Sequence, residues 1–190
     1  RSLLPPRPAP ASSLPPSLAV VFQRRRGSSC RPLPGHPSCP AASALVVRLV
    51  RRVLLVLVAL LQLKINDEIF LIDPLAVDLT PLAEVLNSDV VFVMHAASQD
   101  IEVLERACGV GPRHLFDTQV AAGFTGMSTP SLSALVERYV GLRLPKGDRL
   151  TDWFERPLRK NQQDYAANDV QYLFEIHDRL VSDLKEAGRL

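Results

Sequence analysis

The sequence predicts an α/β layered domain over residues 43–190, preceded by a disordered tail over residues 1–42. Apolar runs of strand length alternate with segments of helical periodicity from about residue 53 onward, an order typical of a sheet flanked by helices. The tail holds ten of the 16 prolines and has no hydrophobic period. Such a composition cannot bury enough apolar surface to offset the entropy of folding.

The charge changes abruptly along the chain. Residues 1–66 carry ten Lys and Arg side chains and no Asp or Glu, whereas residues 67–190 carry 12 Lys and Arg against 20 acids. The net charge of +2 therefore describes neither half. Three scattered cysteines are too few for a disulfide framework, so a reducing, cytoplasmic location is expected. They are Cys30, Cys39 and Cys108.

The first regular element is an apolar run that begins at Val53 and predicts a buried strand. Its unbroken part, Val53–Leu61, has nine residues, and a membrane-spanning helix needs about 20. We therefore expect no membrane partner. Asn66 and Asp67 are turn residues, and Ile69–Ile72 is a second apolar run. The two runs predict a β-hairpin.

A helix, a strand and a second helix follow. Thr80 suits an N-cap and Pro81 the first helical position, so a helix is expected through about Asn87. Val90–Met94 is short and wholly apolar, which is typical of a strand buried on both faces. Ser98–Cys108 has a helical stripe and is closed by a glycine.

The remaining elements are one strand and three helices. Leu115 and Phe116 indicate a short strand, and Asp117 is placed to cap a helix that runs to about Phe124. Ser131–Val140 predicts another helix. Asn161–Ala187 predicts the longest, ended by a glycine.

Two carboxylates stand out by their positions. The inward stripe of the last helix contains Asp169, with Tyr165 one turn before it. A buried unpaired charge is costly, so Asp169 needs a cation, a hydrogen-bond network or a wet cleft, unless it lies at the edge of the stripe beside solvent. Asp100 follows a buried strand, where ligands bind in α/β sheets. The helix dipole would favour it there without any ligand.

Together these segments resemble the ribonuclease D type of 3′–5′ exonuclease, over about Leu60–Leu180. The matching stretches occur in the family's order and are Phe70–Ala76, His95–Leu104, Phe116–Gln119, Leu144–Leu158 and Tyr165–Val170. The resemblance implies a ribonuclease H-like fold with a mixed sheet flanked by helices.

The same resemblance implies hydrolysis of nucleic acid, with RNA as the expected substrate, from its 3′ end by two divalent cations, Mg²⁺ or Mn²⁺. In this family such ions activate the attacking water and stabilise the leaving oxygen. It makes Asp100 and Asp169 metal ligands and Tyr165 the residue that orients the water. No obligate protein partner is expected.

Other polar side chains in the matching region have two interpretations each. His95, Lys146 and Arg149 are candidates for nucleic-acid contacts, although a hydrogen-bonded histidine and isolated surface cations are common. Asp117 suits a helix cap better than a metal ligand. Trp153 suits a core anchor better than a base-stacking surface.

The first motif of the family, Asp-x-Glu on the first strand, is missing. By spacing it should lie around Leu45–Val47, where the sequence reads Leu-Val-Val. Asp67 and Glu68 cannot replace it, because they are adjacent in a turn and do not alternate along a strand. Two carboxylates should hold divalent cations poorly, since these ions depend on charged oxygen ligands.

Two functions therefore compete: a metal-dependent 3′–5′ exonuclease, and a catalytically inactive nucleic-acid-binding relic of one. Membrane tethering through Val53–Leu63 is a weaker third. The acid-free composition ends close to where the resemblance begins. From this we expect that residues 1–44 are not part of the functional domain and that the genuine protein carries an Asp-x-Glu strand there.

Overall fold

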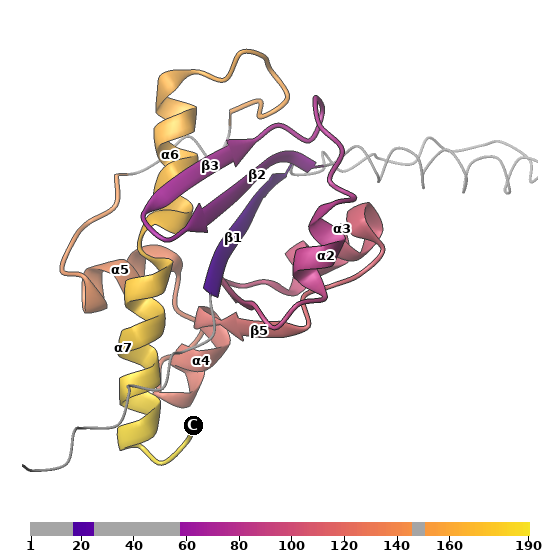
Figure 1. Ribbon diagram of the computed structural model, residues 1–190. Helices are drawn as coiled ribbons and strands as arrows, with labels where there is room; N and C mark the ends of the chain where they lie inside the picture. The colour runs from indigo at the N-terminus through magenta and orange to yellow at the C-terminus, as the bar shows by residue number, and fades with distance from the viewer. Residues whose placement is uncertain (1–16, 25–57, 146–150) are drawn as a thin grey trace, which may run out of the picture.

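A computed structural model describes residues 17–24, 58–145 and 151–190 of the chain. These residues form one five-stranded mixed sheet with helices on both faces (Figure 1). The strands are β1 (Ser17–Arg24), β2 (Val58–Ile65), β3 (Glu68–Ile72), β4 (Val91–Met94) and β5 (His114–Asp117). The helices are α2 (Leu82–Leu86), α3 (Ser98–Cys108), α4 (Thr118–Phe124), α5 (Leu132–Tyr139), α6 (Lys160–Gln171) and α7 (Leu173–Glu186).

The strand order is β3-β2-β1-β4-β5, so β1 is the central strand. It pairs antiparallel with β2 and parallel with β4. The outer pairs are an antiparallel β2–β3 hairpin and a parallel β4–β5 pair. Because β1 and β4 run the same way, their carboxyl ends lie at one edge of the sheet.

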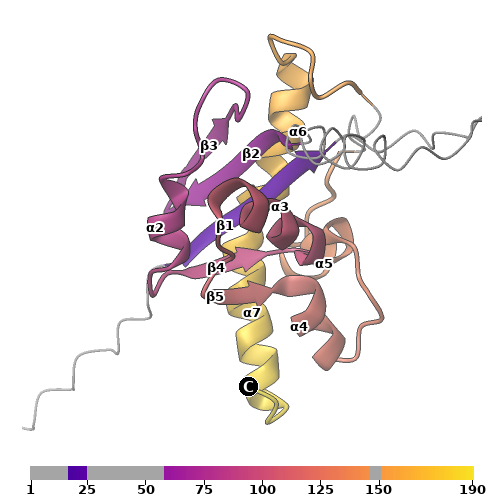
Figure 2. The ribbon, with the colours of Figure 1, turned by 90° about the vertical axis from the view of Figure 1, so that its right-hand side faces the viewer.

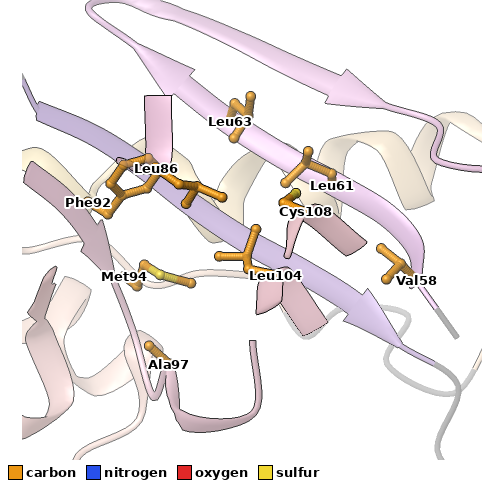
Figure 3. Packing of buried hydrophobic residues seen from close by; sticks show 9 residues of the cluster. All are labelled: Val58, Leu61, Leu63, Leu86, Phe92, Met94, Ala97, Leu104 and Cys108. Carbon is orange, nitrogen blue, oxygen red and sulfur yellow. The ribbon is translucent and has the colours of Figure 1, made fainter. Parts of the chain in front are cut away.

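Helices α2 and α3 cover one face of the sheet, and α6 and α7 cover the other (Figure 2). On the first face β2, β4, α2 and α3 share an apolar core (Figure 3), which includes Leu61, Leu86, Phe92 and Leu104, each at most 1% exposed. On the second face α6 packs across the three strands β1, β2 and β3, and α7 packs on β4. The sheet is thus buried on both sides.

The central strand is a correction to the expected tail. The composition predicts that Ser17–Arg24 belongs to a disordered tail outside the functional domain, whereas the structure shows that it forms β1 in the middle of the sheet. The physical reason is that β2 and β4 each need a hydrogen-bonded neighbour in the middle of the sheet, and the apolar stretch Ser-Leu-Ala-Val-Val-Phe can fill that place. The rest of residues 1–42 and the strand expected around Leu45–Val47 lie outside the described residues.

The last helix is a second correction. One helix was expected over Asn161–Ala187, and the structure has α6 and α7 with a break at Tyr172, whose backbone angles are φ −104° and ψ 1°. The break lets α6 follow the strands β1–β3 while α7 packs against β4, α4 and α5.

Most other elements agree with the expectations. The β2–β3 hairpin turns at Asn66, which has a positive φ of 54°. Helix α3 has the expected bounds, and Gly109 ends it in the left-handed conformation. Thr80 does not cap α2: Pro81 is the N-cap, and the Thr80 hydroxyl donates to Asp78 Oδ1. None of the helices in the described part of the chain is long and apolar enough to cross a membrane.

Candidate functional site

Asp100 lies in the first turn of α3, just beyond the carboxyl end of β4, and is 8% exposed. Three residues, His95–Ala97, connect the strand to this helix. Ala96 has a positive φ of 54°, a conformation that non-glycine residues adopt only when their surroundings hold them in it. The position of Asp100 therefore depends on what holds this connection.

Asp117 holds it. Its Oδ1 accepts from the backbone N–H of Ala96 at 3.0 Å, and its Oδ2 accepts from that of Ala97 at 2.8 Å. The same carboxylate caps α4, because Oδ1 also accepts from the N–H groups of Gln119 at 2.8 Å and Val120 at 3.4 Å. The expected helix cap is confirmed. In addition, the Asp117 carboxylate, at the end of β5, fixes by hydrogen bonds the connection that leads to Asp100.

His95 is a hydrogen-bonded histidine at the end of β4. The Thr118 hydroxyl donates to Met94 O at 3.1 Å, and His95 Nδ1 lies 2.9 Å from the same hydroxyl oxygen. Since the hydroxyl proton goes to Met94 O, Nδ1 donates, which leaves Nε2 of the neutral ring as an acceptor. Burial lowers the pKa of His95, and the charge of Asp117 opposes that shift only in part. At neutral pH this ring therefore offers a hydrogen bond rather than a positive charge.

Tyr165 and Asp169 are half-buried on α6, one turn apart. Their helix is fixed to the sheet by Ala166, which packs on Leu60, and by Val170, which packs on Ala19 and Val93. The Tyr165 ring lies 5.9 Å from the Trp153 ring, centroid to centroid. Asp100 thus comes from the α3 face and Asp169 from the α6 face of the sheet. That both carboxylates face one cleft stays a prediction.

The segment that carries Trp153 is tied to the sheet by Arg156. Its Nε and Nη2 donate to the two oxygens of Asp73 at 2.6 and 2.8 Å, and Nη2 also donates to Ala59 O at 2.7 Å. Its Nη1 donates to the carbonyls of Trp153 and Glu155. Ala59 O is accessible because the β1–β2 register skips Ala59, pairing Gln23 with Leu60 and Arg24 with Val58. All five donors of the guanidinium are used.

The stability of the domain at low pH should depend on the hydrogen-bonded pair of Arg156 and Asp73. Hydrogen bonding from Arg156 holds the pKa of Asp73 below its ordinary value of 3.8. A carboxyl group whose pKa is lower in the folded state than in the unfolded state stabilises the fold at pH values above its unfolded-state pKa. This contribution is lost as the pH falls through the folded-state pKa. We expect the free energy of unfolding to drop below about pH 4, as measured by urea titrations between pH 5 and pH 3. Asp73→Asn and Arg156→Met should each remove this part of the drop in the free energy of unfolding. If the pH profile is unchanged in both variants, the Arg156–Asp73 pair does not stabilise the fold.

Comparison with known proteins identifies the fold and the family. A family model described as 3′–5′ exonuclease matches residues 51–185, from before β2 into α7. The chain belongs to the 3′–5′ exonuclease family. Ribonuclease D of Xanthomonas oryzae is 47% identical over 135 residues, which are 70% of this chain and 37% of that relative. Ribonuclease D of Zymomonas mobilis is 43% identical over 68% of this chain and 35% of its own length. The chain therefore spans little more than a third of the length of those relatives.

Solved structures agree. Escherichia coli RNase D, described as an exoribonuclease involved in structured RNA processing, matches with a TM-score of 0.74 and 31% identity over 93% of this chain and 41% of that one. Brucella melitensis NrnC with bound Mg²⁺ matches with a TM-score of 0.62 at 22% identity, over 70% of this chain and 67% of that one, and shows the fold alone. The expected ribonuclease H-like mixed sheet of a ribonuclease D-like exonuclease is confirmed.

The acids of this exonuclease domain do not fit a pair of divalent cations. No group of three or more His, Cys, Asp or Glu side chains able to hold a metal occurs among residues 17–24, 58–145 and 151–190. The central strand β1, Ser-Leu-Ala-Val-Val-Phe-Gln-Arg, contains no acid. Asp100 and Asp169 alone provide fewer charged oxygens than two such ions need.

The remaining residues considered for the site are Lys146, Arg149 and Trp153. Lys146 and Arg149 lie outside the described residues. Trp153 is 3% exposed and packs with Leu60, so it is a core anchor as expected.

Sequence reasoning missed the two side chains that position the family motifs. The cap function of Asp117 was readable from the helix-start pattern, but its bonds to Ala96 and Ala97 join residues 20 and 21 positions apart. Arg156 and Asp73 are 83 positions apart. Neither long-range pairing leaves a local signal in the sequence.

Proposed function

We propose that this domain acts on the 3′ ends of RNA and removes nucleotides by 3′–5′ hydrolysis. The observation that carries the proposal is that the two family motifs lie on the elements that flank the central strands: Asp100 at the carboxyl end of β4, and Tyr165 with Asp169 on α6. The names of the curated relatives, each a ribonuclease D, support RNA as the substrate class.

In this proposal the Tyr165 hydroxyl would orient the attacking water, and Asp100 and Asp169 would be the two acids that hold a divalent cation. His95 Nε2 is an acceptor in the neutral ring, so it would contact a hydroxyl of the terminal ribose rather than a phosphate. Lys146 and Arg149 remain proposed phosphate contacts.

A second candidate, binding of RNA 3′ ends without hydrolysis, is favoured by one observation. The strand at the centre of the sheet carries no acid, so the cations would be held by two carboxylates where the family uses four. We expect hydrolysis by this chain to be slow for this reason.

A single assay separates the two candidates. A 5′-labelled single-stranded RNA is incubated with the chain and Mn²⁺, and we expect slow shortening from the 3′ end that Asp169→Ala abolishes and Tyr165→Phe reduces. Asp164→Ala is the matched control, because Asp164 is an exposed acid on the same helix, paired with Lys160. Binding without shortening would support the second candidate. Neither binding nor shortening would contradict both.

A further inference from the structure

Trp153 is the only tryptophan of the chain, and its side chain is buried. Its indole nitrogen is also buried and has no hydrogen-bond partner among the described residues. A buried donor without a partner is a net cost to the fold, and native proteins rarely retain one without a reason. What the residue contributes therefore comes from the contacts of its ring.

The ring joins the sheet, α6 and the proposed water-orienting residue. It packs in one apolar cluster with Leu60 of β2 and Ala166 of α6. Its centroid lies 5.9 Å from that of the Tyr165 ring, and the two ring planes are tilted by 45°. Aromatic pairs with centroids about 4.5–7 Å apart attract each other beyond the effect of the area that they bury. The contact thus favours one placement of the Tyr165 ring over its other rotamers.

Hydrogen bonds fix the backbone on both sides of the Trp153 ring. Arg156 Nη1 donates to Trp153 O at 2.8 Å, while its Nη2 donates to Ala59 O of β2 at 2.7 Å. On the other side, the buried Gln162 of α6 donates from Nε2 to Asp152 O at 3.1 Å. The ring is therefore held both from the sheet and from the helix.

Tyr165 needs a fixed neighbour if its hydroxyl is to act on a water molecule. The side chain is half-buried, and its hydroxyl lies at the far end of the ring, so a change of χ1 rotamer carries the hydroxyl away from its place. A misplacement of about 1 Å can cost about 100-fold in rate. A ring that restricts χ1 would therefore matter for catalysis as well as for packing.

We propose that Trp153 is a positioning residue for Tyr165: its ring holds the Tyr165 side chain in one rotamer and so fixes the place of the hydroxyl. The effect on catalysis rests on the proposed function. The effect on the rotamer does not. A residue that only anchored the core would leave the Tyr165 rotamer unchanged when it is replaced.

The rotamer of Tyr165 tests the proposal directly. In the full chain with ¹³C,¹⁵N-labelled tyrosine, three-bond couplings from Cγ to the backbone N and C′ atoms report χ1, and Tyr165→Phe identifies the Tyr165 signals among those of the three tyrosines. We expect a single rotamer in the unaltered chain and an average over several in Trp153→Leu, which fills part of the space without a ring. A single rotamer in Trp153→Leu, or averaging in the unaltered chain, would overturn the proposal.

Further variants separate positioning from a general loosening of the core. Trp153→Phe retains a ring and should narrow the average relative to Trp153→Leu; no narrowing would count against the ring contact and overturn the proposal. Leu135→Ala is the matched control, because Leu135 is 0% exposed in a separate cluster that Tyr139 and Tyr172 border. If it disturbs Tyr165 as much as Trp153→Leu does, the proposal is wrong. Should Trp153→Leu not fold, Trp153→Met takes its place with the same expected averaging, because methionine adapts to irregular core space.

Hydrolysis then tests the consequence for catalysis. At saturating RNA and Mn²⁺, Trp153→Leu should slow shortening from the 3′ end about tenfold with KM unchanged, and should have no further effect in a Tyr165→Phe background. Equal losses in both backgrounds would mean that Trp153 does not act through the Tyr165 hydroxyl, which overturns the catalytic part. If the unaltered chain shortens no RNA, the proposed function is wrong, and the couplings still decide whether Trp153 holds Tyr165.

Discussion

Introducing Asp at position 21 and Glu at position 23 is expected to give the chain Mg²⁺-dependent shortening of RNA at least about 100-fold faster than the unaltered chain. Loss of a hydrogen bond to a metal ligand costs roughly 10–100-fold in affinity or activity. Loss of the ligand itself should cost at least as much. The two positions alternate along β1, as Asp-x-Glu requires.

The location of β1 supports this expectation. It runs parallel to β4, which leads to Asp100, and α6, which carries Asp169, packs across it. Acids on β1 would therefore stand on the strand that pairs with β4 and lies under α6, and four carboxylates suit two cations.

The measurement is the rate of loss of the 3′-terminal nucleotide from a 5′-labelled RNA at fixed Mg²⁺. Val21→Asn is the matched control, because it adds polarity without charge and should give no gain. Adding Asp169→Asn to the two new acids should remove the gain. If the unaltered chain is as fast as the chain with four acids, β1 is not where the missing ligands belong.

Asp117→Ala is expected to destabilise the domain by about 3 kcal/mol. Loss of a helix cap typically costs about 1 kcal/mol, and N–H groups left without a charged acceptor add about 1–3 kcal/mol. The carboxylate accepts four backbone hydrogen bonds, two within α4 and two from the strained connection after β4.

Ser131→Ala provides the comparison. The Ser131 hydroxyl caps α5 by accepting one backbone hydrogen bond, from Ala134 N–H at 3.2 Å, so the loss of this cap should cost only about 1 kcal/mol. Free energies of unfolding from urea titrations give both values. Equal costs would mean that Asp117 only caps α4. A larger cost for Asp117→Ala, with faster amide exchange at Ala96 and Ala97, would show that it also holds the connection to Asp100.

The helix bounds and the hairpin were readable from the sequence because their signals are local. The apolar stripe of α3 and the glycine that ends it lie within 12 residues, and the β2–β3 turn at Asn66 joins neighbouring runs. The resemblance likewise rested on short motifs, and the family comparison confirmed it. Each of these features depends on contacts between residues close together in the chain, so the order of residue types is enough to predict them.

The break at Tyr172 had no such signal. The buried positions of α6 and α7 continue one helical period across it, at Gln162, Ala166 and Val170 and then at Leu173 and Ile176. What differs across the break is the surface beneath: α6 contacts the strands β1–β3, and α7 contacts β4.

By itself, then, the sequence determined the α/β class, the family and most element bounds, and it showed that the first acidic motif is absent. Only the tertiary structure decided that Ser17–Arg24 is the central strand and that Asp117 and Arg156 position the motif-bearing segments. The physical reason is the distance along the chain. Cross-strand pairs and side-chain bonds join residues about 20–80 positions apart, and which residues meet is settled only when all the layers pack together.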